Sequence, residues 1–73
     1  MKLTVNHVNM EHTYVSNFQK LRYKKDRAPF ELSSDEIDKF LLEEVNDRLS
    51  ITFIGNSVVT IPKQNIESLV FSK

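Results

Sequence analysis

The sequence contains no cysteine and no tryptophan, and only one glycine and two prolines among its 73 residues. Without cysteine the chain cannot form disulfides or thiolate zinc sites, which fits a reducing compartment, so we expect a cytoplasmic protein. The single glycine, Gly55, excludes a glycine-rich loop of the kind that cradles phosphates. No segment approaches the run of about 20 apolar residues that a membrane span requires. We therefore expect no membrane-embedded part.

The charge is balanced, with ten basic and ten acidic residues. A net charge of zero argues against a general polyanion binder. The length predicts a single small domain over residues 1–73, with a core of limited size. Lysine, asparagine and isoleucine, whose codons are AT-rich, are frequent, whereas alanine occurs once. This usage suggests an AT-rich genome and makes a phage or mobile-element origin a reasonable hypothesis.

The last third of the sequence predicts a β-hairpin, a turn and a returning strand. Two runs rich in β-branched residues flank Gly55-Asn56-Ser57, which suits a tight turn. A three-residue loop would pair Phe53 with Val59 and Ile51 with Ile61, and would gather the apolar side chains on one face. A two-residue loop would mix polar and apolar side chains on both faces. We therefore predict the three-residue register, although its glycine comes first rather than last.

The residues after the hairpin predict a sharp change of direction. Pro62 has no N–H to donate to a sheet, so the strand should end there or lie at an edge. Lys63-Gln64-Asn65 then forms a turn or one helical turn, and Ile66–Phe71 a short last strand. This order of elements resembles the arrangement in small barrels such as SH3-like and Sm-like ones, a likeness of order without a shared motif.

Ser33–Asp47 is predicted to form the one helix of the chain. Ser33 and Glu36 match the S-x-x-E capping box, and Leu32 and Ile37 have the spacing of a hydrophobic staple. An apolar stripe at helical spacing could lie on a sheet: Ile37, Phe40, Leu41 and Val45. The predicted fold class is therefore α+β, with one helix at about residues 33–47 packed on a small, mainly antiparallel sheet.

The N-terminal half is less regular. Lys2–Val8 alternates apolar and polar side chains and predicts a first strand. Thr13–Lys25 fits both helical spacing and strand-favouring residue types, and we favour a strand that pairs with the first one. Asp26-Arg27-Ala28-Pro29 is interpreted as a break, because the residue before a proline is pushed away from helix.

A basic segment within residues 20–27 is the first candidate binding site. Its members are Lys20, Arg22, Tyr23, Lys24, Lys25 and Arg27. Cations that meet phosphates, interleaved with aromatic rings that stack on bases, would suit single-stranded nucleic acid. The alternative is an ordinary solvated edge, where lysine discourages aggregation.

Acidic residues dominate the predicted helix and its approach. They are Glu31, Asp35, Glu36, Asp38, Glu43, Glu44 and Asp47. They could dock on a basic partner, although a charged solvent face is the usual interpretation. Leu42 lies off the apolar stripe and could contact a partner or merely reach the edge of the core. We take Asp38, Leu42 and Glu43 as candidate contact residues.

The sequence offers little for catalysis or metal binding. His7, Glu11 and His12 do not have the H-E-x-x-H spacing that places two histidines on one helix face. Capping is a sufficient explanation for Ser33 and Ser34, so neither is a supported nucleophile. We expect no metal site, no cofactor and no enzymatic activity.

These observations lead to one preferred hypothesis and one rival. We expect a small non-enzymatic interaction protein that binds a macromolecular partner, by preference a protein, as a regulator or inhibitor. The rival is a nucleic-acid-binding domain that uses residues 20–27. We also predict a homodimer, through Ile66–Phe71 or the helix face at Leu42, because a chain this short gains stability from oligomerisation.

Overall fold

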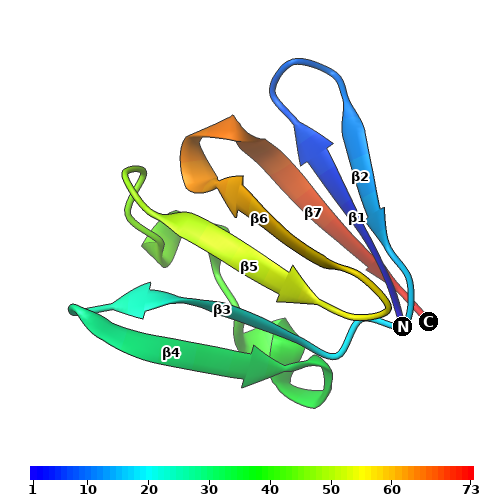
Figure 1. The fold of residues 1–73 in the computed structure, drawn as a ribbon, viewed down its shortest axis with the longest axis horizontal. Helices are drawn as coiled ribbons and strands as arrows, with labels where there is room; N and C mark the ends of the chain where they lie inside the picture. The colour runs from blue at the N-terminus through cyan, green and yellow to red at the C-terminus, as the bar shows by residue number, and fades with distance from the viewer.

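The computed structural model describes all residues from Met1 to Lys73 as a mostly β protein with two antiparallel sheets (Figure 1). The first sheet has the strand order β2-β1-β7 and the second β4-β3-β5-β6. The strands are β1 (Lys2–His7), β2 (His12–Val15), β3 (Lys20–Lys25), β4 (Ala28–Ser33), β5 (Ser50–Ile54), β6 (Val58–Pro62) and β7 (Ile66–Ser72). Three short 3₁₀ turns complete the chain: η1 (Ser34–Lys39), η2 (Leu42–Glu44) and η3 (Lys63–Asn65).

The predicted α+β class is wrong, because residues 33–47 do not form a helix. Ser33 is the last residue of β4, lies opposite Lys20, and makes no side-chain cap hydrogen bond. Between η1 and η2 the backbone is extended at Phe40 and Leu41. Capping and propensity contribute little to helix stability compared with tertiary packing. Here strand pairing takes Ser33, so the local capping signal is overridden.

The path of this segment also changes which side chains reach the core. Val45 is buried, and Leu42 packs against the core, whereas Leu41 is 51 % exposed. The helical stripe predicted Leu41 to be buried, which is wrong, whereas Leu42 reaches the edge of the core, one of its two expected roles. Two short turns joined by extended residues direct side chains differently from a regular helix, because the 3.6-residue period is lost.

Replacing Ser33 with alanine should therefore change the free energy of unfolding by no more than about 0.5 kcal/mol. If Ser33 capped a helix, the same substitution would lower the free energy of unfolding by about 0.5–2 kcal/mol. Urea unfolding followed by circular dichroism distinguishes the two values. A loss above about 1 kcal/mol would demonstrate a cap hydrogen bond that the structure lacks.

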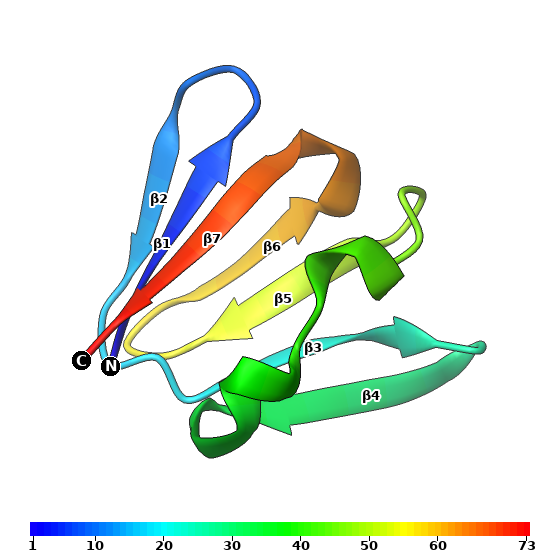
Figure 2. The same ribbon diagram turned by 180° about the vertical axis from the view of Figure 1, so that it is seen from behind.

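Residues 34–49 form a crossover between two parallel strands. Both β4 and β5 pair antiparallel with β3, so they run in the same direction on its two sides. Figure 2 shows η1 and η2 passing across one face of this sheet, with the right-handed sense usual for such connections. The crossover, which carries the acidic residues of the predicted helix, thus covers one face of the sheet that contains the basic segment.

The stretch predicted as a break at residues 26–29 instead contains a hairpin turn and the start of β4. Asp26 and Arg27 both have positive φ, 52° and 68°, as a two-residue type I′ turn requires. Lys25 pairs with Ala28 across it, and Pro29 pairs with Lys24. Hydrogen-bonded pairs alternate along such a ladder, so the nitrogen of Pro29 faces away from β3. Proline is tolerated there because β4 is an edge strand.

Several predictions for the strands are confirmed. Phe53 pairs with Val59 and Ile51 with Ile61, the three-residue register. β6 ends at Pro62, one 3₁₀ turn follows, and β7 begins at Ile66. The first strand is present, and β2 pairs with it. β3, in contrast, pairs with β4 and β5 rather than with the first strand.

The core lies between the two sheets and the crossover. The first sheet contributes Leu3, Val5 and Val15, and the second contributes Leu21 and Phe53, each at most 1 % exposed. The remaining buried residues of this single cluster are Phe18, Tyr23, Leu32, Val45, Ile51, Ile61 and Ile66. The buried side chains therefore form one continuous cluster to which both sheets contribute.

Candidate functional site

Strand alternation divides the basic segment between two faces of its sheet. Leu21 and Tyr23 point into the core and are buried, so Arg22 and Lys24 point to the opposite, outer face. Lys20 lies on the same outer face as Arg22. Tyr23 therefore points to the opposite face of the sheet from Arg22 and Lys24.

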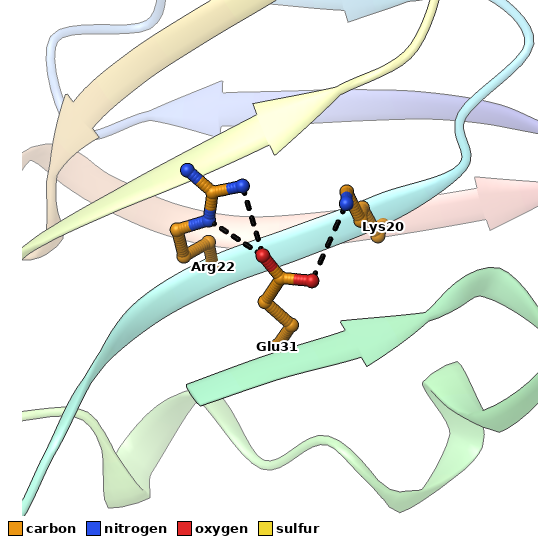
Figure 3. A network of polar contacts seen from close by, with 3 residues as sticks. All are labelled: Lys20, Arg22 and Glu31. Atoms are coloured by element: carbon orange, nitrogen blue, oxygen red, sulfur yellow. Dashed lines mark hydrogen bonds and ion pairs between the residues drawn. The ribbon is translucent and has the colours of Figure 1, made fainter. Parts of the chain in front are cut away.

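Two of the cations are held by a single carboxylate (Figure 3). Lys20 Nζ lies 3.3 Å from Glu31 Oε2, and Arg22 donates from Nε to Glu31 Oε1 at 2.9 Å. Both hydrogen bonds lower the pKa of Glu31, and the one from Lys20 has the larger effect. The stabilisation is present at neutral pH and is lost as the pH falls through this lowered pKa. Since the three side chains are 38–48 % exposed, the contribution is small.

The other cations gather at the end of the β3–β4 hairpin without an ion pair. Lys24, Lys25 and Arg27 lie at the turn, and Arg48 lies on the approach to β5. None of these four side chains forms a salt bridge. We call Lys24, Lys25, Arg27 and Arg48 the basic end.

Two adjoining hollows lie at the basic end. The larger, of about 510 Å³, is bounded by the hairpin turn and by Glu44, Asn46 and Leu49. The second, of about 390 Å³, is lined by Arg22, Lys24 and Arg48 with Tyr23, Pro29, Leu49, Ser50 and Thr52. No carboxylate lines the second hollow. Its cations and hydroxyl groups could therefore receive an anionic group from a partner.

The aromatic rings of this region are used for packing. Tyr23 is buried, and its ring centroid lies 5.3 Å from that of Phe30 and 5.8 Å from that of Phe40. Burial, and secondarily the charge of Glu44, raises the pKa of Tyr23. Lys25 Nζ lies 4.9 Å from the Phe30 centroid. The structure therefore offers no exposed ring at the basic end on which a base could stack.

The acidic candidates lie elsewhere on the crossover. Asp38 borders a separate hollow near the chain termini, with Met1 and Lys73. Glu43 is exposed in η2, while Leu42 packs against the core. These candidates and the basic end do not form one site. Of the crossover carboxylates, that of Glu44 lines the larger hollow, together with Asp26 of the hairpin turn.

Arg48 is the site residue that the sequence did not reveal. A cation just after a predicted helix would be explained by the helix dipole, but the helix predicted over Ser33–Asp47 does not form. In the structure, the backbone N–H of Arg48 donates to Asn46 Oδ1 at 2.9 Å, which fixes the turn before β5. Arg48 follows Lys24 by more than twenty residues, so no local pattern could show that both line one hollow.

Each histidine lies within hydrogen-bond distance of a polar side chain. His7 Nε2 lies 2.7 Å from Thr13 Oγ1, whereas His12 Nδ1 lies 2.7 Å from Asn6 Oδ1. Asn6 and His7 are successive strand residues, so these two pairs lie on opposite faces. No group of three or more metal-ligating side chains is present.

Comparison with known proteins adds no assignment. No protein-family model, curated protein or solved structure matches the chain. Among the helical segments of the structure, none is long and apolar enough to cross a membrane.

Proposed function

We propose that this protein is a non-enzymatic binding protein whose basic end contacts an acidic surface of a protein partner, as a small regulator or inhibitor. The observation that carries this proposal is the grouping of unpaired charge. Six basic residues make no salt bridge, and four of them form the basic end. The other two, Lys2 and Lys73, lie at the termini.

Complementary charge would serve mainly to speed and orient association. Exposed cations attract an acidic surface over about 8–10 Å at physiological salt. Such steering affects the association rate and the register more than the affinity. The apolar surfaces of Pro29 and Leu49, which line the hollow between the cations, would contribute burial.

A protein partner fits the site better than nucleic acid does. Tyr23, the aromatic ring of the basic segment, is buried, as is the nearby Phe18, so neither ring can stack on bases. Glu31 forms ion pairs with both Lys20 and Arg22 and so offsets part of their charge. Asp26 and Glu44 line the larger hollow and would repel a phosphate backbone. Cations with interspersed carboxylates suit the mixed charges of a protein surface.

The test compares two double charge reversals that change the net charge equally. Lys24→Glu with Arg27→Glu alters the basic end, while Lys2→Glu with Lys73→Glu alters exposed cations at the termini. Each variant, immobilised, is used to capture proteins from a lysate of the source organism. We expect a partner captured by the unmodified protein and the terminal variant to bind the basic-end variant at least about tenfold more weakly. Equal capture by both variants would contradict the proposal.

Fluorescence anisotropy with labelled single-stranded DNA and RNA, at two salt concentrations, tests the rival function. We expect no salt-sensitive binding at micromolar protein concentration. Robust binding at low salt that disappears in the Lys24→Glu, Arg27→Glu variant would establish the nucleic-acid function instead, because phosphate contacts weaken steeply with salt.

A further inference from the structure

β2 is an edge strand whose backbone hydrogen-bonding groups are partly unused. The N–H of His7 donates to the carbonyl of Glu11, which identifies that pair as hydrogen-bonded. Such pairs alternate along an antiparallel ladder, so Val5 bonds to Thr13 in the same way. The N–H and C=O groups of His12 and Tyr14 therefore point away from β1. In Figures 1 and 2, no strand lies beyond β2 on that side.

The other sheet edges are protected. On β4 the outward positions include Pro29, which has no N–H, and the charged Glu31, both of which discourage strand addition. β6 and β7 are the remaining edge strands and are joined by η3. β6 ends at Pro62, which has no N–H, and β7 carries the charged Glu67. The dimer contact predicted from the sequence at β7 is therefore less favoured than pairing at an edge without such residues.

β2 carries none of these protections except its short length. The sequence of β2 is His12-Thr13-Tyr14-Val15, with no lysine, carboxylate or proline. Tyr14 is 69 % exposed and Val70 is 50 % exposed. Both pair with Thr4, so they flank it on the outer face of the sheet. Two large exposed side chains thus flank Thr4 on this face, and one of them, Tyr14, lies on the open edge.

We propose that two copies of the chain dimerise by antiparallel pairing of β2 with β2. The outward backbone N–H and C=O groups belong to His12 and Tyr14, which are two residues apart. A two-fold rotation therefore brings these groups opposite the same groups of the second copy. His12 of each copy lies opposite Tyr14 of the other, and each of these two pairs exchanges two backbone hydrogen bonds. The result is a six-stranded sheet with the order β7-β1-β2-β2-β1-β7.

The side chains and charge of the chain are compatible with a second copy as the occupant. His12 and Tyr14 already lie near one another, with ring centroids 6.4 Å apart. In the dimer each tyrosine ring lies across from the histidine of the other copy, which places aromatic surface on both sides of the two-fold axis. The net charge of zero introduces no overall repulsion between copies. This inference is independent of the function proposed for the basic end.

The test combines analytical ultracentrifugation over a wide concentration range with two proline variants. Tyr14→Pro removes an outward N–H of β2 and no N–H that pairs with β1. Glu31→Pro removes an outward N–H of β4 and serves as the matched control. We expect a monomer–dimer equilibrium for the unmodified protein, with the dissociation constant raised at least about tenfold by Tyr14→Pro and unchanged by Glu31→Pro.

A second variant and a direct measurement secure the result. If Tyr14→Pro does not fold by circular dichroism, Tyr14→Lys places a charge from each copy beside the axis and should weaken the dimer similarly. Isotope-filtered nuclear Overhauser spectroscopy on mixed labelled and unlabelled protein should show a contact between Thr13 Hα atoms of the two copies. A mass of 8.5 kDa at every concentration, or a dimer insensitive to all changes at Tyr14, would overturn the proposal.

Discussion

Replacing Phe53 with alanine is expected to lower the free energy of unfolding by about 3–5 kcal/mol. Phe53 is fully buried and is paired with Leu21 on one side and Val59 on the other. Its ring lies in the single core cluster, so truncation leaves a cavity that both sheets would have to fill. Because small domains have a total stability of roughly 5–15 kcal/mol or less, the variant could be largely unfolded at room temperature.

The matched control for Phe53 is Val58→Ala in the same hairpin. Val58 is 65 % exposed, so its truncation should change the free energy of unfolding by no more than about 0.5 kcal/mol. Urea unfolding of both variants, followed by circular dichroism and near-ultraviolet absorption, gives the comparison. Similar losses for the two variants would show that the hairpin face assigned to the core is not buried in solution.

Gly55→Ala is the second change with a large expected effect. A methyl group built at Gly55 would lie 2.6 Å from the carbonyl oxygen of Ser16 and 2.8 Å from Val15 Cγ1. Backbone at Ser16 can move only if the linker between β2 and β3 separates from the β5–β6 turn. That movement would break the hydrogen bond from Asn56 N–H to the Ser16 carbonyl, which is 2.9 Å long. We expect a loss of about 1–3 kcal/mol.

Thermal unfolding of Gly55→Ala beside Ser57→Ala tests this steric explanation. Ser57 lies in the same loop and is exposed, so its substitution should have little effect. Gly55 does not have a positive φ, so the expected loss comes from close approach and not from backbone conformation. A fully stable Gly55→Ala protein would show that the linker can move away from the turn without cost.

The position of Gly55 also illustrates a limit of sequence interpretation. The hairpin register was predictable because a one-residue slip would move every apolar side chain to the opposite face. The glycine at the first loop position did not match loop preferences. Its reason is the carbonyl of Ser16, nearly forty residues earlier in the chain, and no local pattern contains that contact.

The sequence by itself determined the parts of the fold in which local pattern and packing agree. Alternation along Leu49–Ile61 determined which face of the hairpin is buried, and Pro62 determined where β6 ends. The alternation of Lys2–Val8 likewise determined the first strand. In these segments side-chain period and burial point to one structure, because a period of two exposes every second residue.

The tertiary structure decided the parts in which a local signal competed with a distant contact. Ser33 carries a capping signal, but its backbone pairs with Lys20, so β4 continues where a helix was predicted. Asp26-Arg27 lacks the glycine typical of a two-residue turn, and only the pairing of Lys25 with Ala28 imposes it. The basic end was decided in the same way. Arg48 joins Lys24 at one hollow because the crossover carries the chain back beside β3 before β5 begins, and this proximity depends on chain topology and not on sequence spacing.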